Sequence, residues 1–75
     1  MIINKDSIKL IDVSTRSKRK RAASFAIELL ERVRSAEEAN LARFPENFQD
    51  GEAYANAEYS LEVIEGAICE LYDAY

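Results

Sequence analysis

The sequence predicts an all-α fold, an antiparallel helical hairpin, on the strength of three observations. Apolar residues recur every three or four positions along two segments, a spacing typical of amphipathic helices. A proline-containing stretch at residues 44–50 separates these segments, and so short a connection makes two helices antiparallel. The 75 residues are 48% hydrophobic and 32% charged, which excludes a disordered or low-complexity chain.

Residues 1–16 are predicted to form an extended or flexible arm. The segment is rich in Ile, Leu and Val, but its alternation of apolar and polar residues breaks off after a few positions. One short strand is not stable alone in water. We therefore expect this arm either to lie against another chain or to remain mobile.

A helix is predicted over residues 17–43. The run Ser14–Ser17 offers three candidate N-caps. Apolar residues recur at helical spacing through Phe25, Leu29 and Val33, and further apolar positions widen this stripe to about half the circumference of the helix. A single antiparallel neighbour covers less than that. The surplus predicts a second contact, which a homodimer forming a four-helix bundle supplies.

The connection contains Pro45, which ends the first helix because it disfavours the helical conformation at Phe44. Phe44 and Phe48 bracket the turn and are expected to plug the end of the hairpin. Asn47 or Asp50 is the expected N-cap of the next helix.

The last helix, predicted over residues 51–73, carries the clearest pattern in the chain. Its apolar positions follow one another by three and four residues in an unbroken heptad seam. The residues predicted to form the seam of the hairpin or of the oligomer are Phe25, Leu29, Val33, Tyr54, Leu61, Ile64, Ile68 and Leu71.

Charge is divided unevenly along the chain. Residues 1–43 hold all ten Lys and Arg with six acids, whereas residues 44–75 hold eight acids and no base. Half of the bases form what we call the basic cluster: Arg16, Lys18, Arg19, Lys20 and Arg21. In an antiparallel hairpin this cluster is expected to meet Glu70, Asp73 and the C-terminal carboxylate, which explains much of the asymmetry.

The basic cluster is also a candidate contact for nucleic acid or for another acidic partner. Lys and Arg at this density neutralise phosphates, and basic charge at a helix N-terminus opposes the macrodipole, so helix stability does not explain its position. The acidic second half weighs against tight DNA binding, because it repels the same backbone.

Side chains that carry most enzyme chemistry are scarce. The chain has no His and a single cysteine, Cys69, which excludes the usual zinc sites, a Cys–His nucleophile and an intrachain disulfide. Gly51 and Gly66 stand alone, so no phosphate-binding loop is expected. We expect no catalytic residue, cofactor or metal, no membrane span or secretory signal, and a reducing, cytoplasmic location.

The turn and the helix after it form a recognisable pattern. It runs Phe44-Pro45-Glu46-Asn47-Phe48-Gln49 and continues through Glu52, Tyr54, Glu58, Leu61, Ile64, Ala67 and Ile68. With Glu37-Glu38, these residues resemble small uncharacterised helical-hairpin proteins of bacteriophages and integrated mobile elements, which show a Leu-Pro-Glu-Asn-Leu-Gln-like turn before an acidic, heptad-patterned helix. The resemblance covers about residues 28–75. It implies a hairpin fold and a phage or mobile-element origin, and it implies no site residues.

The leading interpretation is a non-enzymatic module that self-associates and binds another protein through the surplus apolar stripe and tyrosines such as Tyr59. One alternative is a nucleic-acid-associated regulator that contacts phosphates through the basic cluster. The other is an inhibitor of a host enzyme that acts through the acidic second helix.

Overall fold

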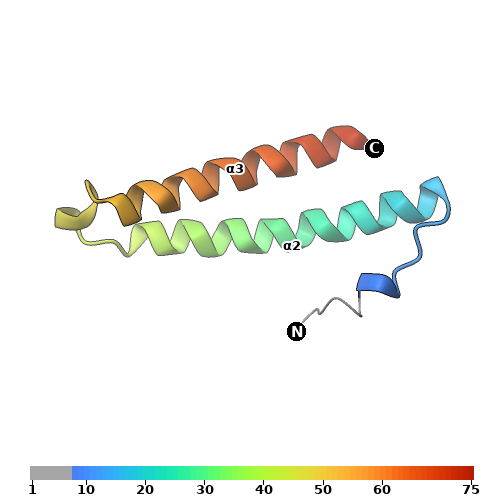
Figure 1. The fold of residues 1–75 in the computed structure, drawn as a ribbon, viewed down its shortest axis with the longest axis horizontal. Coiled ribbons are helices and arrows are strands. Elements are labelled where there is room, and N and C mark those ends of the chain that lie inside the picture. The colour runs from blue at the N-terminus through green and yellow to red at the C-terminus, as the bar shows by residue number, and fades with distance from the viewer. Residues whose placement is uncertain (1–7) are drawn as a thin grey trace.

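The computed structural model describes residues 8–75 as two long helices that run antiparallel, side by side (Figure 1). Helix α2 spans Arg16–Ala42, the short 3-10 helix η1 spans Glu46–Phe48, and helix α3 spans Glu52–Ala74. Helices α2 and α3 pack against each other, and no strand occurs within residues 8–75. The predicted all-α hairpin is confirmed.

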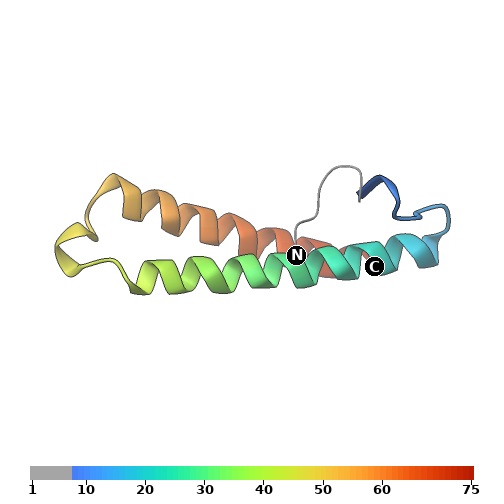
Figure 2. The ribbon, with the colours of Figure 1, turned by 90° about the horizontal axis from the view of Figure 1, so that it is seen from below.

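The segment before α2 is described from residue 8 onward, so the conformation predicted for residues 1–7 lies outside the described residues. Residues 8–15 are not extended throughout, because the Ile11 amide donates to the Ile8 carbonyl at 3.1 Å and closes a turn. Figures 1 and 2 show this segment folding back beside the first turns of α2, on the side away from α3 in Figure 1.

Both ends of α2 follow local signals in the sequence. Thr15, one of the three candidate caps, is the N-cap, and its side-chain oxygen accepts from the Lys18 amide at 3.1 Å. The helix ends at Ala42, three residues before Pro45, where a continuing helix would lack an amide donor. The Arg43 and Phe44 amides instead bond back to carbonyls of the last turn.

The predicted cap of α3 was wrong. Gly51 occupies the N-cap position and no side chain caps the helix. Asn47 lies inside η1, and Asp50 precedes the cap residue, so neither side chain reaches the free amides of the first turn. The turn is held by backbone bonds instead, in which the Phe48 amide donates to the Pro45 carbonyl and the Gly51 amide donates to the Phe48 carbonyl.

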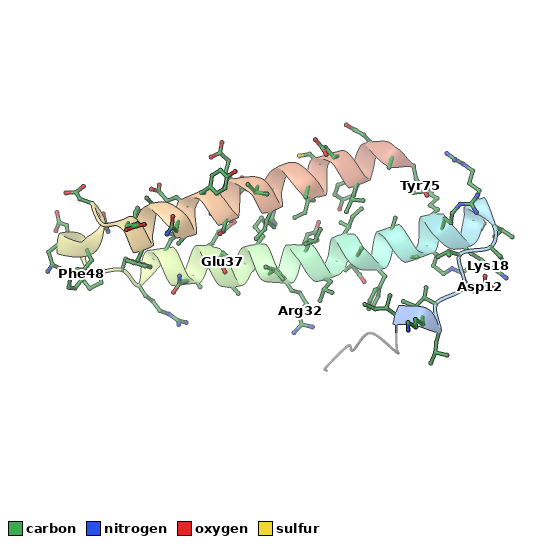
Figure 3. The ribbon with its side chains drawn as sticks, in the orientation of Figure 1. Asp12, Lys18, Arg32, Glu37, Phe48 and Tyr75 are labelled. Carbon is green, nitrogen blue, oxygen red and sulfur yellow. The ribbon has the colours of Figure 1, made fainter. Side chains whose placement is uncertain are left out.

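Phe44 and Phe48 have different roles at the closed end of the hairpin. The Phe44 ring packs edge-on against the Tyr54 ring, with centroids 5.2 Å apart, an arrangement that adds to the apolar contact. Phe48 is mostly exposed and does not plug the hairpin, because η1 carries it outward at the tip (Figure 3).

The heptad seam of α3 matches the pattern of burial. Ile68 is buried, and the other half-buried positions of α3 keep the spacing of three and four residues, with one addition. They are Tyr54, Ala57, Leu61, Ile64, Ala67 and Leu71. Tyr75, four residues beyond Leu71, remains exposed.

The face that α2 turns toward α3 is not the stripe that the sequence indicated. Phe25, Leu29 and Val33 remain 44%, 43% and 38% exposed and lie outside the hairpin seam. The heptad-spaced positions of α2 that are buried or half-buried are Ala23, Ile27, Leu30, Arg34, Glu37 and Leu41. The short connection fixes this face, because Leu41 must meet α3 directly after the turn, and counting back by threes and fours leads to Ile27.

The apolar core between the helices is small. Only Ile27 and Ile68 are buried among the hydrophobic residues that the structure describes, at 7% and 5% exposure. The chain exposes 6247 Å², whereas a folded monomer of 8.5 kDa exposes about 4,700 Å² on the usual scaling with mass. One hairpin therefore leaves an unusually large surface in water.

Candidate interaction surfaces

One apolar row on the surface of α2 is what we call the α2 stripe, formed by Phe25, Leu29 and Val33 at four-residue spacing. At about 100° per residue, these side chains lie about a third of a turn around α2 from the face that packs on α3. The α2 stripe and the hairpin seam are thus two separate apolar faces of one helix. A wide apolar surface on a helix is typical of two packing contacts.

The segment before α2 extends the α2 stripe at one end. Ile11, Ala22 and Phe25 line a shallow cavity of about 450 Å³ that opens between this segment and the first turns of α2. Its edge carries an ion pair between the Lys18 ammonium and the Asp12 carboxylate at 2.6 Å. This bond holds the pKa of Asp12 below its ordinary value and fastens the segment to α2.

The basic cluster does not pair with the acidic end of α3, which corrects the sequence-based expectation. Among residues 8–75, no ion pair joins the cluster to Glu70 or Asp73. Arg16 instead lies over the Tyr75 ring, 5.1 Å from its centroid, a favourable cation–π contact. Tyr75 lies at the open end of the hairpin (Figure 3), where α2 begins with Arg16.

The other members of the basic cluster face solvent or local backbone. Arg19 donates to the Val13 carbonyl at 3.1 Å, and Lys18 bonds Asp12. Lys20 and Arg21 line an open groove of about 680 Å³ beside the C-terminal turn of α3. Four of the five cations in the cluster therefore lack a carboxylate partner within the described part of the chain.

A polar contact also joins the two long helices. The Tyr72 hydroxyl donates to Glu31 Oε1 at 2.9 Å, which joins α3 to α2. The Glu31 carboxylate raises the pKa of Tyr72, first through this hydrogen bond and then through its charge. The apolar spacing in the sequence gives no signal for this contact.

Arg34 and Glu37 introduce charge into the α2 side of the seam. Arg34 Nε lies 3.6 Å from Glu38 Oε1, an ion-pair distance that is too long for a hydrogen bond. The nitrogen itself is shielded from solvent and has no hydrogen-bond partner among residues 8–75. A search for apolar residues overlooks Arg34 and Glu37 because both are charged. Only the spacing of three and four residues from Leu41 back to Ile27 places them in the seam.

The structure adds little in the way of chemically reactive groups. Cys69 is an exposed free thiol, and within residues 8–75 no three side chains of the metal-binding types gather closely enough to hold an ion. Neither helix of the described part has a stretch long and apolar enough to span a bilayer. Tyr59 and Val63 are exposed one turn apart on α3 and make a second, smaller apolar surface.

Comparison with protein-family models, with curated proteins and with solved structures finds no match to this chain.

Proposed function

We propose that this protein is a small non-enzymatic interaction module that self-associates through the α2 stripe, two hairpins forming a four-helix bundle. The observation that carries the proposal is the exposure of Phe25, Leu29 and Val33 in an unbroken row on α2. Water contact with such a row is unfavourable at about 25 cal/mol for each Å² of apolar surface. A second copy supplies an equal row to cover it.

The exposed area supports a second copy as the partner. The surface exceeds that of a typical folded monomer of this mass by about 1,500 Å². A standard protein interface covers about 800 Å² on each partner. Self-association through one face of α2 therefore fits within the excess and leaves Tyr59 and Val63 on α3 for a further protein partner.

The test is the solution mass of two matched variants, measured by light scattering after size exclusion. Leu29→Glu places a charge at the centre of the α2 stripe and is expected to give a folded monomer of about 8.5 kDa. Val63→Glu places the same charge on an exposed position of α3 and is expected to keep the mass of the natural chain, about 17 kDa. Equal masses for the two variants would contradict the proposal.

A second candidate function rests on the basic cluster. Within residues 8–75, Lys18 is the one member of the cluster in an ion pair, so the cations Arg16, Arg19, Lys20 and Arg21 remain available to phosphates. The candidate function is regulation in association with nucleic acid, with backbone contacts and no base readout. The proposed phage or mobile-element origin is compatible with either function and is tested by the genes that surround this one.

Salt titration of binding to a random DNA duplex tests this second function. We expect micromolar affinity at moderate salt and a logarithmic salt slope that reports several phosphates. Lys20→Gln combined with Arg21→Gln is expected to reduce that slope by about 2, while Lys9→Gln, an exposed cation outside the cluster, leaves it nearly unchanged. Binding weaker than millimolar, or equal slopes for all three proteins, would exclude the function.

A further inference from the structure

We infer that the second copy packs antiparallel to the first, α2 against α2, about a two-fold axis that passes close to Leu29. This inference rests on the proposed self-association and adds its orientation and register. It follows from the order of the side chains along the α2 stripe and from the charges on either side of it.

The α2 stripe is nearly symmetric about its middle residue. Phe25 and Val33 each lie four residues from Leu29. In an antiparallel pair centred there, Leu29 meets its own copy and Phe25 meets Val33 of the second copy, so that the large ring packs against the small side chain at both ends. A two-fold interface of this kind uses the same patch on both partners.

The charges beside the α2 stripe favour the antiparallel pair. Glu28 and Arg32 are exposed on one edge of the stripe, four residues apart, and Arg32 projects away from α3 (Figure 3). Antiparallel packing brings Glu28 of each copy beside Arg32 of the other, twice across the axis. A parallel two-fold pair sets this edge of the two copies on opposite sides of the interface, so neither Glu28–Arg32 pair forms there.

The ends of α2 give the same result at longer range. A parallel pair sets the five cations of the basic cluster beside the same five cations of the second copy. An antiparallel pair centred on Leu29 sets the two basic clusters at opposite ends of the α2 pair. Separation of like charges therefore favours the antiparallel orientation.

Among residues 8–75, no segment covers the centre of this proposed interface. Helix α3 packs on a different face of α2, about a third of a turn away, and the segment before α2 reaches the cavity beside Phe25 while Leu29 and Val33 remain open to solvent. With both α2 helices related by the two-fold axis, the two α3 helices lie on the same side of the α2 pair, as the four-helix bundle requires.

Disulfide cross-linking of the full chain tests the orientation, in a Cys69→Ser background that removes the natural thiol. Leu29→Cys is expected to cross-link with itself under mild oxidation. Phe25→Cys alone is expected to give no cross-linked dimer, because the two thiols of an antiparallel pair lie about 12 Å apart along the helices, beyond the reach of a disulfide. Phe25→Cys refolded together with Val33→Cys is expected to give the mixed dimer.

The same samples separate failure of the orientation from failure of the self-association. Cross-linking of Phe25→Cys with itself, without enrichment of the mixed dimer, would show a parallel pair and overturn the orientation alone. A 17 kDa dimer with no cross-link at any of the three positions would place the interface elsewhere and also overturn the inference. A mass of 8.5 kDa for every uncross-linked variant, with full helicity by circular dichroism, would reject self-association itself.

Discussion

Single side chains join parts of this chain that the sequence pattern does not connect. The hydrogen bond from Tyr72 to Glu31 joins residues 41 positions apart in the sequence. The contact of Arg16 with Tyr75 joins the first residue of α2 to the last residue of the chain, at the open end of the hairpin. Periodicity places a residue on one side of a helix but does not give the register between two helices. Such pairs are therefore visible only once the helices are docked.

The hydrogen bond with Glu31 predicts that Tyr72 loses its proton at a higher pH than an unperturbed tyrosine. Its pKa is raised above the ordinary value of 10.0, so the difference in ultraviolet absorbance between the natural chain and Tyr72→Phe should show a midpoint above pH 10. Glu31→Leu should lower that midpoint, since it removes both the hydrogen-bond acceptor and the negative charge. A midpoint at pH 10 in the natural chain would show that the hydrogen bond does not persist in solution.

The raised pKa of Tyr72 also makes the stability of the fold depend on pH. A pKa that is higher in the folded chain means that folding favours the neutral hydroxyl. The stabilisation by Tyr72 is therefore fully present below pH 10 and is lost as the pH rises through the raised pKa. Unfolding midpoints of the natural chain and of Tyr72→Phe should converge in that alkaline range.

Thr15 is the one helix cap that local sequence predicted and the structure confirms. Thr15→Ala should lower the free energy of unfolding by about 1 kcal/mol, because the Lys18 amide loses its acceptor. Thr15→Ser keeps the side-chain oxygen, so its free energy of unfolding should stay close to that of the natural chain. Chemical denaturation measures both, and equal losses for the two variants would assign the effect to the threonine methyl group instead.

The two helices differ in how far their packing was predictable. In α3 one heptad seam stands alone, so the residues counted from the sequence, such as Leu61 and Ile64, are the half-buried ones. In α2 two apolar rows share the helix, and the row with the larger side chains is the exposed one. Which row of α2 packs on α3 is decided at the turn. Leu41 and Phe44 meet α3 there, and this contact sets the face that the rest of α2 turns toward α3.

Two substitutions by alanine on α3, one in the seam and one outside it, are expected to differ in their effect on stability. Ile68→Ala removes the most buried side chain, at a cost of about 2–5 kcal/mol, which is comparable to the whole stability of so small a core. Val63→Ala, at a position 51% exposed, should change stability by less than about 0.5 kcal/mol. Thermal melts followed by circular dichroism should therefore show a lost transition for the first variant only.

Substitution by alanine is expected to have opposite effects on stability at the two glycines of α3 and its N-cap. Gly66 lies inside the helix, and a Cβ atom there meets nothing within 4 Å, so Gly66→Ala should raise stability by about 1 kcal/mol. Gly51 is the N-cap, where alanine is a poor residue, and a Cβ atom would lie 3.3 Å from the Phe48 carbonyl. Gly51→Ala should lower the melting temperature, and a fall for Gly66→Ala would contradict this account of α3.

On the scale of the whole molecule, the part of the chain that the structure describes has only two buried core residues and a large exposed surface. A hairpin of this size gains little from its own packing, so the proposed dimer is expected to supply part of the stability of the fold. The sequence predicted the need for a second contact from the width of the apolar surface on α2. It did not predict which of the two rows would be left for that contact.

Coupling between assembly and folding predicts that the melting temperature rises with protein concentration. The reason is mass action, since dilution favours dissociation and the separated hairpin is the less stable form. Leu29→Glu should remove this dependence and melt at a lower, constant temperature. A melting temperature of the natural chain that does not change over a hundredfold range of concentration would show that folding is independent of self-association.

The most direct test of the central claim, that a second copy covers Phe25, Leu29 and Val33, is sedimentation equilibrium of the natural chain at tens of micromolar. The predicted mass is about 17 kDa, twice that of one 8.5 kDa chain, falling toward the monomer on dilution. A single species of 8.5 kDa that keeps its full helical signal by circular dichroism would contradict the claim.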